Sequence, residues 1–288
     1  MGHELRTAVV TGASAGIGKA TAVALARMGW HVIGVGRDPA RSAAAEAEIR
    51  AAAAPLASVG FVRADFTLMS DVRRAADEIK AMTSRIDVLI NNAGGVRDSL
   101  VVTREGHEAT FAANHLAAFL LTRELMPVLK ETARTGLPGT VRVIAVSSSG
   151  HAVCPGMNWV DLNLRDHFTT AGAYCQAKLA NILFTRELTR RAAADGIIAQ
   201  CMHPGVIDSN FIAHADEVMR SYMRTQDAKP PEHAARTLVF LATSPEAGHD
   251  GGRYFHDGTE VPPAPQALDD DAARRLWEES EKLLALGG

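Results

Sequence analysis

Short apolar runs alternate along the chain with longer stretches in which apolar and polar residues recur at helical spacing. The runs are rich in β-branched residues and are apolar nearly throughout, as expected for a parallel sheet that is covered on both faces. We therefore predict six buried strands: TAVVTG (7–12), HVIGVG (31–36), SVGFVRAD (58–65), RIDVLINNAG (85–94), TVRVIAVSS (140–148) and GIIAQCMHPG (196–205).

The intervening stretches predict helices. GKATAVALARMGW and DVRRAADEIKAMTSR are amphipathic or rich in alanine, and the Ala-rich piece 43–54 favours helix over disorder because alanine has the highest helix propensity. Alternating strands and helices imply right-handed crossovers and a doubly wound α/β fold with helices on both faces. No repeat or linker divides the chain, so we expect one domain over residues 1–288.

Two segments interrupt this alternation. Residues 149–172 form a long connection, and residues 206–230 carry scattered apolar side chains. Insertions of this length are typically functional, and both follow the carboxyl ends of strands, where such sheets bind ligands. We expect residues 206–230 to cover a substrate. Residues 263–288 form a C-terminal extension whose helix we expect over the substrate mouth or at a subunit contact.

Composition narrows the classes of function. Of the 288 residues, 47% are hydrophobic and 22% are charged, which is typical of a globular protein with a sizeable core. A net charge of −3 predicts no attraction to nucleic acid or anionic membranes. Three cysteines without CxxC spacing indicate reduced thiols and a cytoplasmic location. We expect no signal peptide, membrane anchor or membrane span.

The first predicted strand runs into a glycine-rich turn, TGASAGIG, at the start of the first helix. Glycines there permit a tight turn, close approach of the backbone to a phosphate, and close packing of helix on strand. The helix N-terminus adds free N–H groups for a pyrophosphate. An ordinary strand–helix turn is the alternative. We predict a dinucleotide site that includes Gly12, Ser14, Gly16, Ile17 and Gly18.

The end of the second strand bears on the choice of cofactor. Gly36 stands where NAD-binding folds usually place an acid, and Arg37 follows it. A guanidinium suits a 2′-phosphate, so we favour NADP(H) over NAD(H), although Arg37 could be a solvated loop charge and Asp38 lies just beyond. Asp65 ends the third strand and is either a partner for the adenine amino group or a helix cap.

With these features, NNAG at 91–94, serines at 147–149 and YCQAK at 174–178, the chain resembles the short-chain dehydrogenase/reductase family. The resemblance spans residues 5–260 and implies a Rossmann-type fold. Longer stretches such as FAANHLAAFLLT (111–122) and ARRLWEESEKLL (273–284) resemble the retinol-dehydrogenase-like branch, and we expect a soluble member of it.

Tyr174 is the candidate acid and base for hydride transfer between an alcohol and a ketone or aldehyde. Lys178 lies one helical turn later, so both side chains can reach one cleft, and its ammonium would favour the phenolate. In the family this lysine also holds the nicotinamide ribose.

The resemblance assigns further roles at the catalytic end. Aligning VIAVSS to the family gives Ser148 the hydrogen bond to the substrate oxygen, although Ser149 extends the pattern and leaves the choice open. Asn114 would hold a water that relays protons to the lysine. The residues implied to line the cofactor are Asn91, Ala93, Gly94, Pro204, Gly205 and Ser209.

We therefore expect an NADP(H)-dependent oxidoreductase that acts on a lipophilic small molecule. The alternative is a non-catalytic NADP(H)-binding sensor or interaction protein. The histidines form no HExxH or Cys/His cluster, so we expect no metal. Cys175 is expected to face away from the cleft. The resemblance implies a homodimer or homotetramer.

Overall fold

The computed structural model describes residues 5–286 and confirms the alternation of strands and helices. Each of the six predicted strands is present, and two short strands follow near the C-terminus. The strands are β1 (Thr7–Thr11), β2 (His31–Gly36), β3 (Val59–Arg63), β4 (Val88–Asn91), β5 (Val141–Val146), β6 (Ile197–Met202), β7 (Tyr254–His256) and β8 (Thr259–Glu260). The helices are α1 (Gly16–Arg27), α2 (Pro39–Ala52), α3 (Met69–Met82), α4 (Ala109–Phe111), α5 (Ala117–Thr135), α6 (Thr170–Ala192), α7 (Glu217–Arg224), α8 (Pro231–Thr243) and α9 (Asp270–Leu283).

These strands form one sheet in the order β3-β2-β1-β4-β5-β6-β7-β8. All neighbours pair in parallel except β7 and β8, which form a small antiparallel edge. The strands from β1 to β3 are added toward one edge of the sheet, and those from β4 onward toward the other edge. The order therefore reverses between β1 and β4, which lie side by side at the centre. Ligands of open α/β sheets bind at such a reversal, outside the carboxyl ends of the strands.

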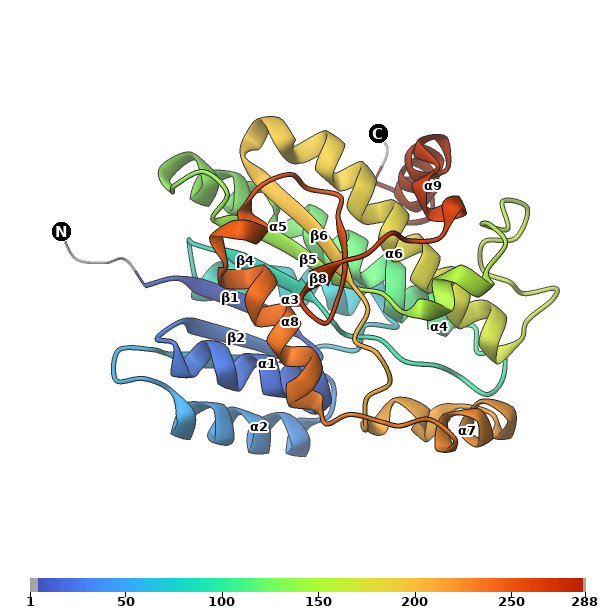
Figure 1. Cartoon of the computed structure of the whole chain (residues 1–288), viewed down its shortest axis with the longest axis horizontal. Helices are drawn as coiled ribbons and strands as arrows, with labels where there is room; N and C mark the ends of the chain where they lie inside the picture. The colour runs from blue at the N-terminus through green and yellow to red at the C-terminus, as the bar shows by residue number, and fades with distance from the viewer. Residues whose placement is uncertain (1–4, 287–288) are drawn as a thin grey trace.

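Helices cover both faces of the sheet (Figure 1), as the apolar runs predicted. Successive strand residues alternate between the two faces. Val10 of β1 belongs to a core shared with α1 and α8, whereas its neighbour Val9 belongs to a core shared with α3, α5 and α6. Each strand is therefore held from both sides, which fixes its carboxyl end for the site.

The C-terminal helix α9 packs on the outer side of α6 (Figure 1), not at a strand end. Trp277 is buried there against the rings of Phe119, at 4.8 Å, and Phe184, at 6.0 Å between centroids. The Arg186–Asp270 ion pair, 2.6 Å long, joins α6 to the start of α9. Helix α9 therefore completes the face of the molecule behind α6.

The segment 206–230 leaves the sheet after β6 and returns before α8. Backbone hydrogen bonds from Lys229 to Val206 and from Asp208 to Lys229, both 2.9 Å, close its two ends. Between them lie the short 3-10 helix η4 (Asn210–His214) and α7. Neither helix contains a buried residue, although Ala215, which lies between them, is buried.

No helix in residues 5–286 combines the length and apolar character needed to cross a lipid bilayer.

Candidate active site

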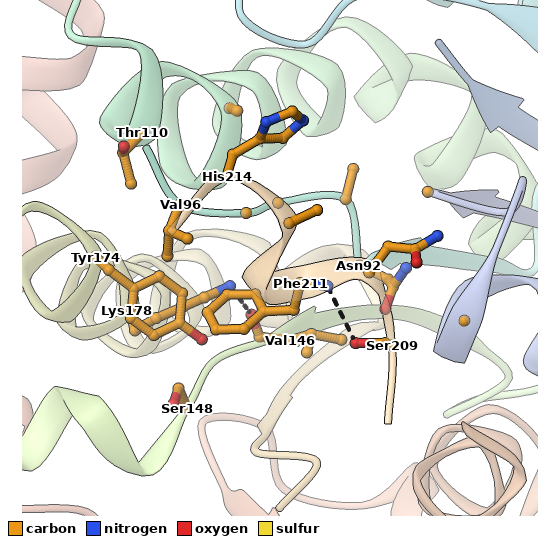
Figure 2. Close-up of a pocket in the computed structure, with 18 of the residues that line it drawn as sticks. Asn92, Val96, Thr110, Val146, Ser148, Tyr174, Lys178, Ser209, Phe211 and His214 are labelled. Atoms are coloured by element: carbon orange, nitrogen blue, oxygen red, sulfur yellow. Dashed lines mark hydrogen bonds between the residues drawn. The ribbon is translucent and has the colours of Figure 1, made fainter. Parts of the chain in front are cut away.

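A cavity of about 800 Å³ lies at the carboxyl ends of β1, β2, β4, β5 and β6. Its walls come from the glycine turn after β1, the loops after β2 and β4, the end of β5, the start of α6 and the segment 206–230. Figure 2 shows its catalytic end. The sequence-predicted residues gather here because parallel strands present their carboxyl ends at one edge.

The glycine turn forms one wall. Gly12 and Gly16 have φ of +68° and +54°, a region that favours glycine. A side chain at Gly18 would collide with the carbonyl oxygen of Gly12, so the third glycine is needed for α1 to pack against the turn. Ser14 and Ile17 line the cavity, whereas Gly18 lies behind the wall.

The wall beyond β2 is basic. Arg37 lines the cavity and forms no hydrogen bond or ion pair with another residue of the described chain. Arg41, from the first turn of α2, lines the same region. A side chain at Gly36 would collide with Ser42 and Ser14, so an acid is sterically excluded at this position. Two guanidinium groups therefore line this end of the cavity, and Arg41 is paired with Asp38, the N-cap of α2, at 3.7 Å.

Arg97 was not singled out from the sequence, and it adds a third guanidinium to the cavity wall. Burial lowers the pKa of Arg97, and repulsion by Arg37 lowers it further. The sequence around it, NNAGGVR, offers no local signal, because only the fold brings the loop after β4 close to the loop after β2.

Asp65 lines the cavity and also caps the turn after β3. Its Oδ1 accepts from the backbone N–H of Thr67, at 2.9 Å, and from the Thr67 hydroxyl, at 2.8 Å. Oδ1 of Asp65 is therefore used as a cap, which is one of the two predicted roles, and the residue also lines the cavity.

Asn91 does not face the cavity, in contrast to the expectation from the family. As the last residue of β4 it points toward α5, where its Nδ2 donates to Thr122 Oγ1 at 3.0 Å. The next residue, Asn92, points the other way and lines the cavity with Ala93 and Gly94. Strand alternation explains the difference.

Asn114 lies in the π-helical turn η1 (Ala112–Leu116) between α4 and α5. Its side chain is buried, donates to the carbonyls of Gly95 and Thr110, both at 2.8 Å, and accepts from the Gly95 N–H at 3.2 Å. A side chain at Gly94 would collide with Asn114 Oδ1. Asn114 thus supports the NNAG loop from behind, and it does not line the cavity itself.

Tyr174 and Ser148 meet at the catalytic end, where the Tyr174 hydroxyl points toward Ser148 (Figure 2). Burial raises the pKa of Tyr174 to about 12, and the hydrogen bond with Ser148 opposes that rise. The phenol is therefore protonated at neutral pH. Lys178 lies on the same side of α6, with Nζ 5.5 Å from the centroid of the Tyr174 ring.

The three serines after β5 differ in what their hydroxyls contact. The buried Ser147 donates to the carbonyl of Lys178 at 2.7 Å, which fastens β5 to α6. Ser148 Oγ accepts from the Gly150 N–H at 3.1 Å, and its hydroxyl also hydrogen-bonds with Tyr174. Ser149 is exposed at the start of the 3-10 helix η2 (Ser149–Val153).

Lys178 is buried, and its ammonium donates to the carbonyl of Val146 at 3.0 Å. Burial lowers the pKa of Lys178 to about 8. An ammonium carries three N–H groups, and Val146 is the hydrogen-bond acceptor found for it among residues 5–286. Two donors therefore remain for a ligand.

Comparison with known proteins agrees with this arrangement. The sequence model of the short chain dehydrogenase family matches residues 6–219. The chain belongs to this family. It is 37% identical to human retinol dehydrogenase 13, over 98% of this chain and 85% of the relative. It is 36% identical to mouse polyprenol dehydrogenase, with the same coverage of both proteins.

A solved structure agrees with the family assignment. The crystal structure of an uncharacterized protein from Mycobacterium paratuberculosis superimposes with a TM-score of 0.73 at 33% identity, over 97% of this chain and 93% of that one. The predicted resemblance to the retinol-dehydrogenase-like branch is confirmed. This short chain dehydrogenase is an oxidoreductase that acts on CH–OH groups with a nicotinamide cofactor.

The wall residues fit such a cofactor. The glycine turn exposes backbone to a pyrophosphate, the basic end suits an adenosine phosphate, and the spare Lys178 donors suit ribose hydroxyls. Pro204 and Gly205, after β6, line the cavity as expected for this family. Ser209 also lines it, but its Cβ lies against Gly16 of the phosphate turn, 3.5 Å from the position a Gly16 side chain would take.

Two side chains near Tyr174 differ from expectation. Cys175 lines the cavity of this dehydrogenase instead of facing away, and burial raises the pKa of Cys175 to about 11. Phe211 of η4 packs on Tyr174 with ring centroids 4.9 Å apart (Figure 2). Phe211 lies in the predicted covering segment, but the sequence gave no sign that it touches the Tyr174 ring.

Proposed function

We propose that this dehydrogenase uses NADP(H) to interconvert a lipophilic alcohol and its ketone or aldehyde, with Tyr174 as the acid and base. The observation that carries the proposal is the convergence of Tyr174, Ser148 and Lys178 at one end of a cavity whose other end is basic. The cofactor, when bound, would supply or accept the hydride.

The protonation states support proton donation by Tyr174 during carbonyl reduction. Because its pKa is raised to about 12, the phenol carries its proton at neutral pH and can deliver it to the substrate oxygen. With substrate bound, Ser148 would donate its hydroxyl proton to the same oxygen and stabilise the charge that develops there. In alcohol oxidation the same groups would act in reverse.

The remaining side chains have binding roles in this proposal. Lys178 would hold the nicotinamide ribose with its two spare N–H groups. Asn114 would keep the NNAG loop in place and would hold a water that relays protons to Lys178. The glycine turn, from Gly12 to Gly18, would bind the pyrophosphate, and Asp65 would face the adenine.

An apolar substrate is supported by the lining of the covering segment. Phe211, Met219 and Met223 line the cavity, and so do Val218 and Tyr222 of α7, which are 80% and 63% exposed. Large apolar side chains that remain exposed beside a cavity mark binding surfaces. We propose that an apolar substrate covers them.

A cofactor-oxidation screen tests this proposal. NADPH and NADH would each be offered with aldehydes, ketones and steroids whose apolar part increases in size. We expect oxidation of NADPH, with kcat/KM rising as the apolar part grows. Tight NADPH binding without hydride transfer to any of these carbonyls would instead support a cofactor-binding sensor.

Replacing Arg37 by alanine tests the cofactor preference. Charge-assisted hydrogen bonds contribute about 1.5–3 kcal/mol, so we expect KM for NADPH to rise roughly 10- to 100-fold while KM for NADH changes little. Arg27→Ala removes the same charge from an exposed position at the far end of α1 and serves as the control. An equal effect of Arg37→Ala on both cofactors would rule out a 2′-phosphate contact.

A further inference from the structure

His151 lies three residues after Ser148 and is buried beneath the catalytic end of the cavity. Both ring nitrogens have partners. Nε2 accepts from the backbone N–H of Ala264 at 3.0 Å, and Nδ1 lies 2.7 Å from the carbonyl oxygen of Ser148. Since an amide N–H can only donate, Nε2 is unprotonated, and Nδ1 carries the proton and donates it to Ser148.

The surroundings of the ring hold it in position. Tyr254 of β7 packs edge-on against it, with centroids 5.1 Å apart, and the Tyr254 hydroxyl lies 3.4 Å from Nδ1. His203, after β6, stacks on Tyr254 at 5.7 Å, and His256 of β7 stacks on His203 at 3.9 Å, so these two rings are the further titratable groups beside it. Burial lowers the pKa of His151, which favours the neutral ring.

A second contact joins the same two segments. Gln266 Nε2 donates to the carbonyl of Cys154, at the end of η2, at 2.6 Å. The segment 264–266 of the C-terminal extension therefore holds η2 at two points, through His151 at its middle and Cys154 at its C-terminal end.

The backbone around Ser148 has few other supports. β5 ends at Val146, and the last sheet-like hydrogen bond runs from the Ser147 N–H to Met202 O at 2.7 Å. The Ser148 carbonyl then accepts from the His151 side chain and, at 3.1 Å, from the N–H of the same residue. The orientation of this peptide sets where the Ser148 hydroxyl points.

We propose that His151 is a positioning residue for Ser148. Through His151, residues 264–266 hold the end of β5 so that Ser148 stays close to Tyr174. The proposal rests on the function proposed above for Ser148. His151 does not line the cavity, so it acts through the Ser148 backbone and not on the substrate. Displacement of a catalytic group by about 1 Å can lower a rate roughly 10²-fold.

Two substitutions separate the two hydrogen bonds of the ring. His151→Asn keeps an N–H donor near the position of Nδ1 and loses the acceptor for Ala264. His151→Gln keeps an acceptor near the position of Nε2 and loses the donor to Ser148. We expect His151→Gln to lower kcat roughly 10- to 100-fold with KM for NADPH unchanged, and His151→Asn to retain most of kcat with a lower Tm.

The controls make the result specific to Ser148. Tyr254→Phe keeps the packed ring, removes the hydroxyl 3.4 Å from Nδ1, and should leave kcat unchanged. Adding His151→Gln to Ser148→Ala should cause little further loss, because the histidine acts through that serine. Equal losses of kcat in the Asn and Gln variants, or a full additional loss in the double variant, would overturn the proposal.

Hydrogen exchange separates this proposal from the proposed function. If the wild-type protein transferred no hydride to any carbonyl in the screen, the proposed function would fail. The positioning role would then be judged from exchange at the backbone amides of Gly150 and His151, which bond to Ser148. We expect faster exchange in His151→Gln than in His151→Asn, and equal exchange in both would overturn it.

Discussion

Replacing Tyr174 by phenylalanine is expected to lower kcat for carbonyl reduction roughly 10²- to 10⁴-fold, the usual contribution of general acid–base catalysis. Phenylalanine keeps the ring that packs on Phe211 and deletes the proton that faces Ser148. The affinity for NADPH should change little, because the ring and Lys178 remain. Steady-state NADPH oxidation and equilibrium binding measure the two effects separately.

Tyr222→Phe is the matched control for this substitution. Tyr222 lines the same cavity from α7, where its side chain is exposed. Loss of its hydroxyl should leave kcat unchanged. Wild-type turnover by Tyr174→Phe on any carbonyl that the protein reduces would show that another group donates the proton.

The raised pKa of Tyr174 also predicts a difference between the two reaction directions. The phenol donates below its pKa of about 12, so protonated Tyr174 is abundant throughout the neutral range. The phenolate needed for alcohol oxidation increases as pH rises toward that pKa. We expect alcohol oxidation to rise steadily between about pH 7 and 9, and carbonyl reduction not to rise.

Replacing Trp277 by alanine is expected to lower the free energy of unfolding by about 3–5 kcal/mol, the usual cost of truncating a buried tryptophan. The indole packs between Phe119 and Phe184, and the guanidinium of Arg191 lies 4.6 Å from its ring centroid. Urea denaturation measures the change. The kcat of the folded protein should be preserved, because Trp277 does not line the cavity.

Trp277→Phe is the control for volume and polarity. The indole Nε1 is buried without a hydrogen-bond partner, so phenylalanine removes both some packing and an unsatisfied donor. These effects oppose each other, and we expect a loss below about 1.5 kcal/mol. A loss of less than about 1 kcal/mol in Trp277→Ala would mean that α9 does not pack on α6 in solution.

Most of the sheet could be predicted from the sequence because its strands are buried on both faces. Such strands are continuous apolar runs, whereas β7 has three residues between GGR and DG and pairs with β6 at only two positions. Three residues are too few to show a strand pattern. Tyr254 and Phe255 form a strand because they pair with β6 and are buried by their neighbours.

The positions of Ser148, Tyr174 and Lys178 at the cavity were predictable because these residues stand in short motifs at the end of a strand and on one helix face. Asn91 shows the limit of a motif, because its side chain follows strand alternation into the core while Asn92 takes the cavity. Arg97, Phe211 and His151 have no local signal. The role of each residue depends on a contact with a segment far away in the sequence, and the whole fold is needed to form that contact.

The position of α9 also determines when contacts of the core can form during synthesis of the chain. His115, in η1, hydrogen-bonds Ser280 of α9, which is 165 residues later in the chain. At about 5–20 residues per second, roughly 8–33 s separate the synthesis of these two partners. Phe119 lacks its Trp277 contact for nearly all of that interval, and Phe184 lacks it from its own synthesis until Trp277 is made, 93 residues later. The aromatic surface that α9 covers in the folded protein therefore stays uncovered by it on the nascent chain until residues 270–283 have been made.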